Sequence, residues 1–265
     1  MSRDPNAKPL AKTPRLPRDW LALGVLALAI SGLFSIIVSF AWHPAIRCIA
    51  LFETLFKRSL VAHVNLSISL WFLCLHFMLS TARTTGSPRV AAALPYVNRS
   101  AQTCMVAAIL TMSTAALLPD ALPQLNNYIP TLYHPLFFVS LGLVTATVVL
   151  AGIRGLYTHF LERATPVTTE TAALLRTYRI TSSGVLVIAL AAFIVSFHAL
   201  SPTAARGEMY FEMLFWGGGH ILQYLWVQLM LTAWLWMLAT LVPGFSPHRE
   251  YRALLWLNLL IVAGA

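Results

Sequence analysis

A histidine and a tyrosine one helical turn apart offer the clearest chemistry in this sequence. His220 and Tyr224 lie in the run Trp-Gly-Gly-Gly-His-Ile-Leu-Gln-Tyr, inside a long apolar stretch. A helix turns by about 100° per residue, so the two side chains share a face, where a metal ion and a phenol can meet. The three glycines remove side-chain bulk, which leaves room for a large flat group. The alternative is a packed membrane helix with one buried histidine and an interfacial tyrosine.

The composition places this pair inside a lipid bilayer. Hydrophobic residues make up 58% of the 265 residues and charged residues only 10%, and the mean hydropathy is +0.72. These values exclude an ordinary soluble domain. No apolar run alternates with polar residues as barrel strands do, so helices must satisfy the backbone in lipid. We therefore expect an all-α, polytopic membrane helical bundle.

Apolar runs of about 20 residues mark the membrane-spanning segments. They occupy residues 20–42, 60–82, 101–119, 132–153, 179–200 and 213–242. A seventh run begins near Leu254 and stops at Ala265, which is too short to span, so the sequence predicts six complete helices and a truncated seventh. Residues 1–19 are expected to form a disordered basic tail, and residues 20–265 a single, incomplete transmembrane domain.

The net charge of +9 follows the predicted topology. With the N-terminus in the cytoplasm, 14 of the 18 Lys and Arg residues fall on the inner side, which obeys the positive-inside rule. Among these we place Arg154 and Arg179 in the inner loop at 154–178 or at its edge. We infer that the charge orients the chain in the bilayer and does not bind nucleic acid. Cys48, Cys74 and Cys104 lack the spacing of a metal site and are expected to be inert thiols.

Among the other histidines, His63 is the strongest candidate ligand. It lies near the outer start of the second predicted helix, whereas His220 lies about 7–10 residues into the sixth, some 10–15 Å deep. Ionisable groups at such depths are costly and usually mark a site, and a neutral imidazole binds haem iron or copper well. His134 and His198, near outer helix ends, are expected to be structural.

His76 shares the second helix with His63 but is a poor partner for it. A separation of 13 residues leaves the two side chains about 140° apart on the helix, so one face cannot present both to stacked haems. We expect His76 to be a packed or water-linked side chain.

Taken together, these residues resemble the N-terminal half of subunit I of the haem–copper oxidases. In that family the second helix carries an axial histidine of the low-spin haem near the outer surface. The sixth helix carries a His-x-x-x-Tyr motif, whose histidine binds copper and whose tyrosine is covalently joined to it. His63 matches the first feature, and His220 with Tyr224 matches the second, with aromatic and glycine residues preceding His220.

The resemblance implies a terminal respiratory oxidase that reduces dioxygen to water, with proton uptake, in the cell inner membrane. His63 would hold the low-spin haem, His220 would hold copper facing a high-spin haem, and Tyr224 would supply an electron and a proton. The implied partners are other oxidase subunits and a cytochrome c or quinol donor. The remaining copper and haem ligands would lie on helices after Ala265, so residues 1–265 alone are expected to be inactive.

The sequence also departs from this family and leaves alternatives open. Ile221 and Leu222 stand where the family often has Pro-Glu, so the glutamate route for protons is not supported. A nitric-oxide reductase shares the fold but uses a sixth-helix glutamate, where this chain has Gln223 and Tyr224. A b-type electron carrier would use pairs from His63, His76, His134 and His198. A transporter with incidental histidines is the third alternative.

Overall fold

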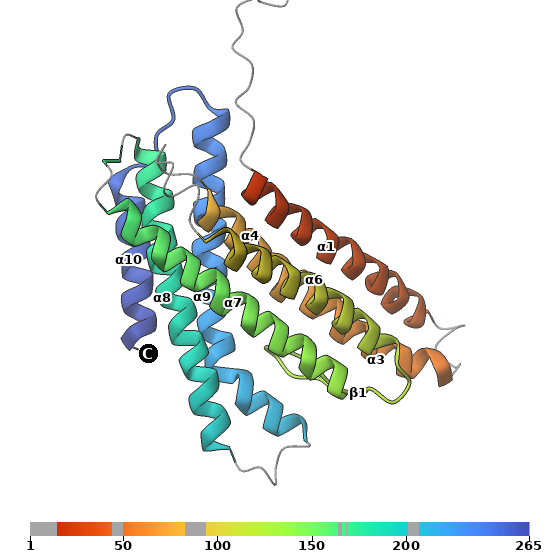
Figure 1. The fold of residues 1–265 in the computed structure, drawn as a ribbon. Helices are drawn as coiled ribbons and strands as arrows, with labels where there is room; N and C mark the ends of the chain where they lie inside the picture. Colours follow the sequence, from red (N-terminus) through yellow and green to blue (C-terminus); the bar gives the residue numbers. More distant parts are fainter. Residues whose placement is uncertain are drawn as a thin grey trace, which may run out of the picture.

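In this computed structural model each predicted apolar run lies largely in a helical segment that extends beyond the run at one end (Figure 1). The structure describes residues 15–43, 50–82, 94–163, 166–167, 169–200 and 207–264. The helices are α1 Arg15–Ala41, α3 Ala50–Val64, α4 Trp71–Thr81, α6 Pro95–Leu117, α7 Pro135–Glu162, α8 Glu170–Ala199, α9 Glu208–Leu241 and α10 Arg249–Gly264. A π-helical segment, η1 Asn65–Leu70, joins α3 to α4.

Within the described residues, six helices are long and apolar enough to cross a membrane, one for each of the six predicted spans. These spans are Pro17–Ala41, Leu55–Thr81, Pro95–Leu117, Pro135–Glu162, Glu170–Ala199 and Glu208–Leu241. The 16 residues of α10 form a shorter helix, which begins five residues before the predicted start at Leu254. The protein is therefore an α-helical membrane protein within the described residues, apart from one small hairpin of β1 Leu122–Gln124 and β2 Thr131–Tyr133.

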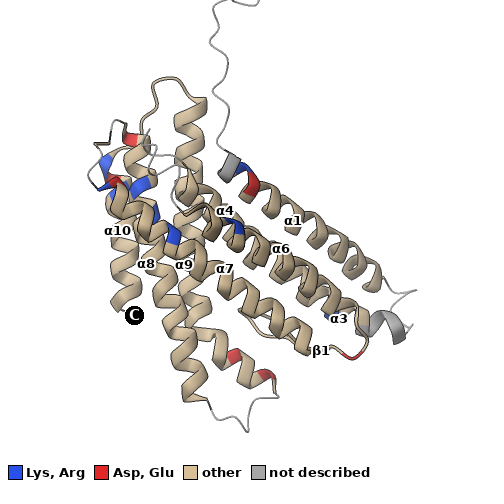
Figure 2. Ribbon diagram, viewed as in Figure 1, with Lys and Arg blue, Asp and Glu red and all other residues tan. Residues whose placement is uncertain are grey.

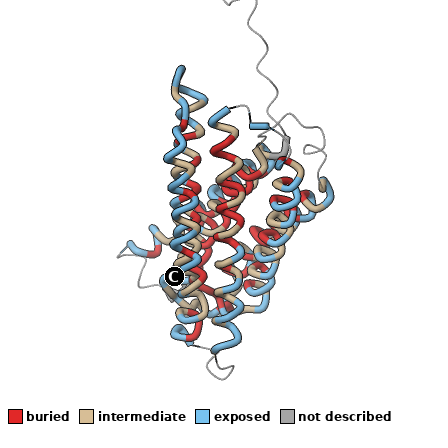
Figure 3. The backbone as a smooth tube through the Cα atoms, turned by 90° about the vertical axis from the view of Figure 1, so that its left-hand side faces the viewer, coloured by how far each residue is buried: buried red, intermediate tan, exposed pale blue. Residues whose placement is uncertain are grey.

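Spanning helices that follow one another in the sequence pack side by side as antiparallel pairs. α1 packs along α3 and α4, α6 along α7, and α8 along α9, with α10 against α8. In Figure 1 the helices α1, α4, α6 and α7 run obliquely to the steeper α8, α9 and α10. Buried residues follow the inward faces of these helices, and exposed ones cover the outside (Figure 3).

Two apolar clusters hold the bundle together. The larger joins α1, α4, α6 and α7, where Trp20 lies 4.8 Å from Phe77 between ring centroids and donates a 3.3 Å hydrogen bond to Asn98 Oδ1. The smaller joins α4, α8, α9 and α10 around Leu79 and Tyr178. Cys74 is buried in the larger cluster and Cys104 is half-buried, and both are free thiols.

Several predicted boundaries were wrong because apolar runs mark only the lipid-facing part of a helix. α1 already begins at Arg15, within the predicted tail 1–19. The predicted inner loop 154–178 is mostly helical, because α7 continues to Glu162 and α8 begins at Glu170, where the Thr169 hydroxyl caps the Ala172 amide. Similarly, α6 begins at Pro95 within the predicted loop 83–100. Proline fits the first helical turn, where its missing amide hydrogen is not needed.

Parts of the predicted tail and loops lie outside the described residues. These are residues 1–14, Arg47, Cys48, Arg83, Arg89, Arg206 and Ala265. Among the described residues, Lys and Arg gather where α7 and α8 meet and α10 begins, and acidic residues lie near the opposite end on α9 (Figure 2).

Candidate functional site

His63 is held against α1 through one ring nitrogen. Its Nδ1 lies 2.9 Å from Ser31 Oγ and 3.1 Å from the Ser31 carbonyl oxygen. The Ser31 hydroxyl donates its hydrogen to the His63 carbonyl at 3.0 Å, so both Ser31 atoms near Nδ1 act as acceptors. This network assigns the imidazole proton to Nδ1 and leaves the Nε2 lone pair for a ligand.

The helix widens immediately after His63. The π-helical segment η1 contains Asn65, Ser67 and Ser69, and the first two use their side chains to bond backbone carbonyls. Ser67 Oγ donates to the His63 carbonyl at 2.7 Å, and Asn65 Nδ2 donates to the Val61 carbonyl at 2.9 Å. π-helical turns inside α-helices occur frequently at functional sites. The second span is therefore irregular in the turn next to His63, as is common near functional sites.

His220 lies in an aromatic setting on α9. Its ring centroid is 4.8 Å from those of both Trp216 and Tyr128. His220 Nδ1 lies 3.3 Å from the Trp216 carbonyl, and Nε2 lies 3.3 Å from the Tyr128 hydroxyl. A neutral imidazole with its proton on Nδ1 would donate to Trp216 and accept from Tyr128.

Tyr128 was not predicted, because it lies in the connection between β1 and β2, 92 residues before His220. Asn126 Oδ1 accepts hydrogen bonds from the Tyr128 and Ile129 amides, which fixes this turn. The next residue, Asn127, donates from its backbone and side chain to the two Glu212 carboxylate oxygens, each at 2.9 Å. The turn is thus tied to α9. The Asn-Asn pair in the sequence signals such a turn but not its partner.

The glycines before His220 accommodate aromatic rings of this chain. A Cβ on Gly218 would collide with the Phe193 ring of α8, and a Cβ on Gly219 would lie 2.7 Å from Tyr128 Cβ. Gly217 has only Ala192 Cβ nearby, at 3.8 Å. The predicted space for a large flat group is therefore filled at Gly218 and Gly219 by Phe193 and Tyr128.

Tyr224 lies one turn beyond His220 on α9, as the spacing predicts. Its side chain is 38% exposed, and its backbone carbonyl accepts a 3.4 Å hydrogen bond from Asn258 Nδ2 of α10. Among the described residues, the phenol paired with a His220 ring nitrogen is that of Tyr128. The role expected for Tyr224 stays a prediction.

His63 and His220 face different neighbours, namely α1 and the β1–β2 turn. No group of three or more His, Cys, Asp or Glu side chains that could hold a metal ion occurs in the described part of the chain. Each imidazole can therefore supply one ligand to a metal or haem, and the other ligands would have to come from residues outside these described groups.

Of the other histidines within lipid depth, His76 and His134 have structural partners. His76 is buried, and its Nδ1 lies 2.8 Å from the Tyr178 hydroxyl, which links α4 to α8. His134 Nδ1 accepts the Leu136 amide at 3.1 Å and caps α7, with Nε2 3.5 Å from Asp120. His198 is exposed.

A buried ion cluster, also missed from the sequence, joins α7 and α8. Arg179 pairs with Glu162 and donates to the Ser80 and Ala82 carbonyls at 2.7 and 2.9 Å. Arg154 is 6% exposed and interacts electrostatically with both. The placement of Arg154 and Arg179 at the inner loop was wrong, since both lie buried within helices. Arg179 therefore also holds helices together, in addition to any effect of its charge on the orientation of the chain in the bilayer.

The chain is similar to two bacterial proteins that are named as uncharacterised. It is 27% identical over 278 residues to one from Rickettsia prowazekii (strain Madrid E), and 28% identical over 247 residues to one from Aquifex aeolicus (strain VF5). Each match covers 92% of this chain but only 51% and 56% of the respective relative. The chain thus spans about half the length of the curated relatives it matches. No protein-family model matches it, and no solved structure matches it.

Proposed function

We propose that this chain forms the first half of the catalytic subunit of a haem–copper terminal oxidase. The whole subunit would reduce dioxygen to water with electrons from a cytochrome c or a quinol, coupled to proton uptake across the cell inner membrane. The observation that carries the proposal is the setting of His63, whose Nδ1 is fixed by Ser31 on the second of six spans.

The donor set at His63 fits an axial haem ligand. Metal-binding histidines usually donate one ring N–H to an oxygen, which fixes the tautomer and orients the other nitrogen toward the metal. Within the described residues, the hydrogen bonds of the His63 imidazole ring all involve Nδ1. Ser31 is 1% exposed, so water does not compete for this contact. Ser31 would therefore hold the imidazole plane while Nε2 binds iron.

On the sixth span His220 shares the bonded Nδ1 of His63, but its Nε2 is bonded as well. Its Nδ1 faces the Trp216 carbonyl, and Nε2 is directed at the Tyr128 hydroxyl. Before Nε2 could bind copper, the Tyr128 hydroxyl would have to move away from it, because the two atoms now form a hydrogen bond. One imidazole does not make a copper site, and we assign the further copper ligands to later helices of the whole subunit.

Haem and copper, when bound, supply the binding and reduction of dioxygen. The residues of this chain would orient those groups and provide protons. We assign to Tyr224 the delivery of a proton from its phenol oxygen, because it lies one turn from His220 on the same helix. Ile221 and Leu222, which lie between them in the sequence, have no side-chain group that could transfer a proton.

The partners of the other histidines favour this proposal over a simple electron carrier. A b-type carrier would need pairs drawn from His63, His76, His134 and His198. His76 already pairs with Tyr178 in a packed core, and His134 caps α7. His76 is 2% exposed, so a haem could reach its other ring nitrogen only if the core repacked, and His134 Nε2 already faces Asp120 at 3.5 Å.

Metal analysis and gas turnover of the purified full-length gene product test the proposal. We expect low-spin and high-spin haem together with copper, and oxygen consumption with a reduced cytochrome c or quinol. His220→Ala should remove copper and abolish turnover, whereas His248→Ala, at an exposed position before α10, should change neither. Retention of copper and full turnover in His220→Ala would refute the copper assignment. Turnover of nitric oxide without oxygen would instead indicate a reductase.

A further inference from the structure

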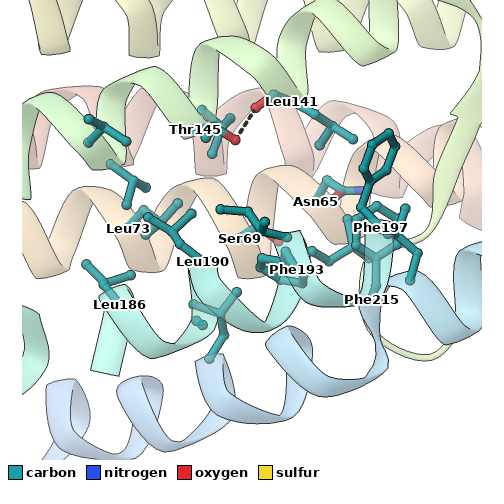
Figure 4. Close-up of a pocket in the computed structure, with 18 of the residues that line it drawn as sticks. Asn65, Ser69, Leu73, Leu141, Thr145, Leu186, Leu190, Phe193, Phe197 and Phe215 are labelled. Atoms are coloured by element: carbon teal, nitrogen blue, oxygen red, sulfur yellow. Dashed lines mark hydrogen bonds between the residues drawn. The ribbon is translucent and has the colours of Figure 1, made fainter. Parts of the chain in front are cut away.

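An elongated apolar cavity lies between four elements in the outer half of the bundle (Figure 4). Its volume is about 450 Å³, and it is enclosed by α4 with η1, α7, α8 and α9. Along α8 its wall runs from Leu186 to His198, thirteen residues, or about 18 Å of helix. The lining is almost wholly aliphatic and aromatic, so the shape and polarity suit a single linear hydrocarbon chain.

The cavity has access to the lipid phase between α7 and α8. Two lining residues that flank this side, Val149 of α7 and Ile194 of α8, are 43% and 58% exposed. An occupant can therefore enter sideways from the bilayer.

One wall of the cavity carries a buried hydrogen-bond acceptor without a donor. Asn65 is 1% exposed, and its Nδ2 donates to the Val61 carbonyl at 2.9 Å and the Pro130 carbonyl at 2.7 Å. These two carbonyls fix the orientation of the amide, because Oδ1 could not replace Nδ2 there. Asn65 Oδ1 has no hydrogen-bond partner among the described residues. Buried acceptors are almost always paired, so this atom points to a missing donor.

We propose that the cavity binds a membrane amphiphile with a hydroxyl headgroup and a linear apolar tail. The hydroxyl donates to Asn65 Oδ1 near the outer end, and the tail extends inward along α8 toward Trp226. A headgroup that only accepts hydrogen bonds, such as an ether or a ketone, would leave Oδ1 unpaired. A charged headgroup would lose its hydration, because no Lys, Arg, Asp or Glu lines the cavity and its one histidine, His198, is exposed.

Trp226 lines the cavity and provides a fluorescent reporter. The test uses the full chain in lipid nanodiscs, titrated with 11-bromo-1-undecanol and with its methyl ether, whose bromine atoms quench nearby tryptophan. We expect saturable quenching that is lost in Trp226→Phe, and binding of the alcohol about tenfold tighter than that of the ether. The comparison of alcohol and ether requires no substitution at Asn65, which also anchors Pro130.

Asn65→Leu, where it folds, should bind alcohol and ether equally. Equal affinity of the wild-type chain for both probes, or quenching unchanged in Trp226→Phe, would overturn the proposal. Lipids extracted from the purified chain distinguish the source of the headgroup: a lipid alcohol with one acyl chain, such as a monoacylglycerol, or an isoprenoid quinol. The result is independent of haem content, so its failure would leave the proposed oxidase function untouched.

Discussion

Replacing Glu162 by glutamine should destabilise the bundle more than any exposed charge change. Glu162 is fully buried and pairs with Arg179, whose side chain is 3% exposed. Removing one partner of a buried ion pair typically costs about 3–5 kcal/mol, because the other charge remains buried. Arg179 would keep its bonds to the Ser80 and Ala82 carbonyls, so we expect the lower end, about 3 kcal/mol. Arg154 adds repulsion once the carboxylate is gone.

The chain offers a matched control in Glu170→Gln. Glu170 pairs with Arg252 at 3.0 Å, but the two side chains are 47% and 28% exposed, and such pairs contribute roughly 0–1 kcal/mol. Thermal unfolding in detergent, followed by circular dichroism, should lower Tm by roughly 6–12 °C for Glu162→Gln and by a few degrees at most for Glu170→Gln. Equal shifts for the two variants would refute a stabilising role for the buried cluster.

Other substitutions test contacts around the candidate site. Gly219→Ala should cost about 1–3 kcal/mol by displacing Tyr128, whereas Gly217→Ala should be nearly neutral; equal unfolding free energies would contradict the packing at Gly219. Tyr178→Phe should cost about 1–3 kcal/mol, since it leaves the buried His76 Nδ1 without its partner. Tyr157→Phe, at a position 45% exposed, should change stability by less than about 0.5 kcal/mol, and a comparable loss in both tyrosine variants would count against the His76 contact.

The six spans were predictable because lipid depth imposes a length and a polarity on each helix. The helix ends were not, because they leave the apolar region and depend on caps such as Thr169 and on side chains such as Arg179 that pair across helices. A hydropathy pattern counts a buried arginine as a loop residue. Its partner, Glu162, is 17 residues away and is brought close only by the packing of α7 on α8.

The candidate residues were predictable by type and depth, but their neighbours were not. His63 and His220 were chosen as candidates from their helix order, their depth and the spacing of His220 and Tyr224. Their contacts with Ser31 and Tyr128 cross 32 and 92 residues of sequence, and no local pattern encodes such pairs. The glycines before His220 indicated a close approach by a flat group. Only tertiary packing showed that Phe193 and Tyr128 make that approach.

The optical spectrum of the reduced full-length gene product, compared with that of its His63→Ala variant, tests the central claim most directly. The proposal predicts a low-spin haem band in the wild-type protein that disappears in His63→Ala and persists in the exposed control His248→Ala. A low-spin band unchanged in His63→Ala, or purified protein without haem, would contradict it.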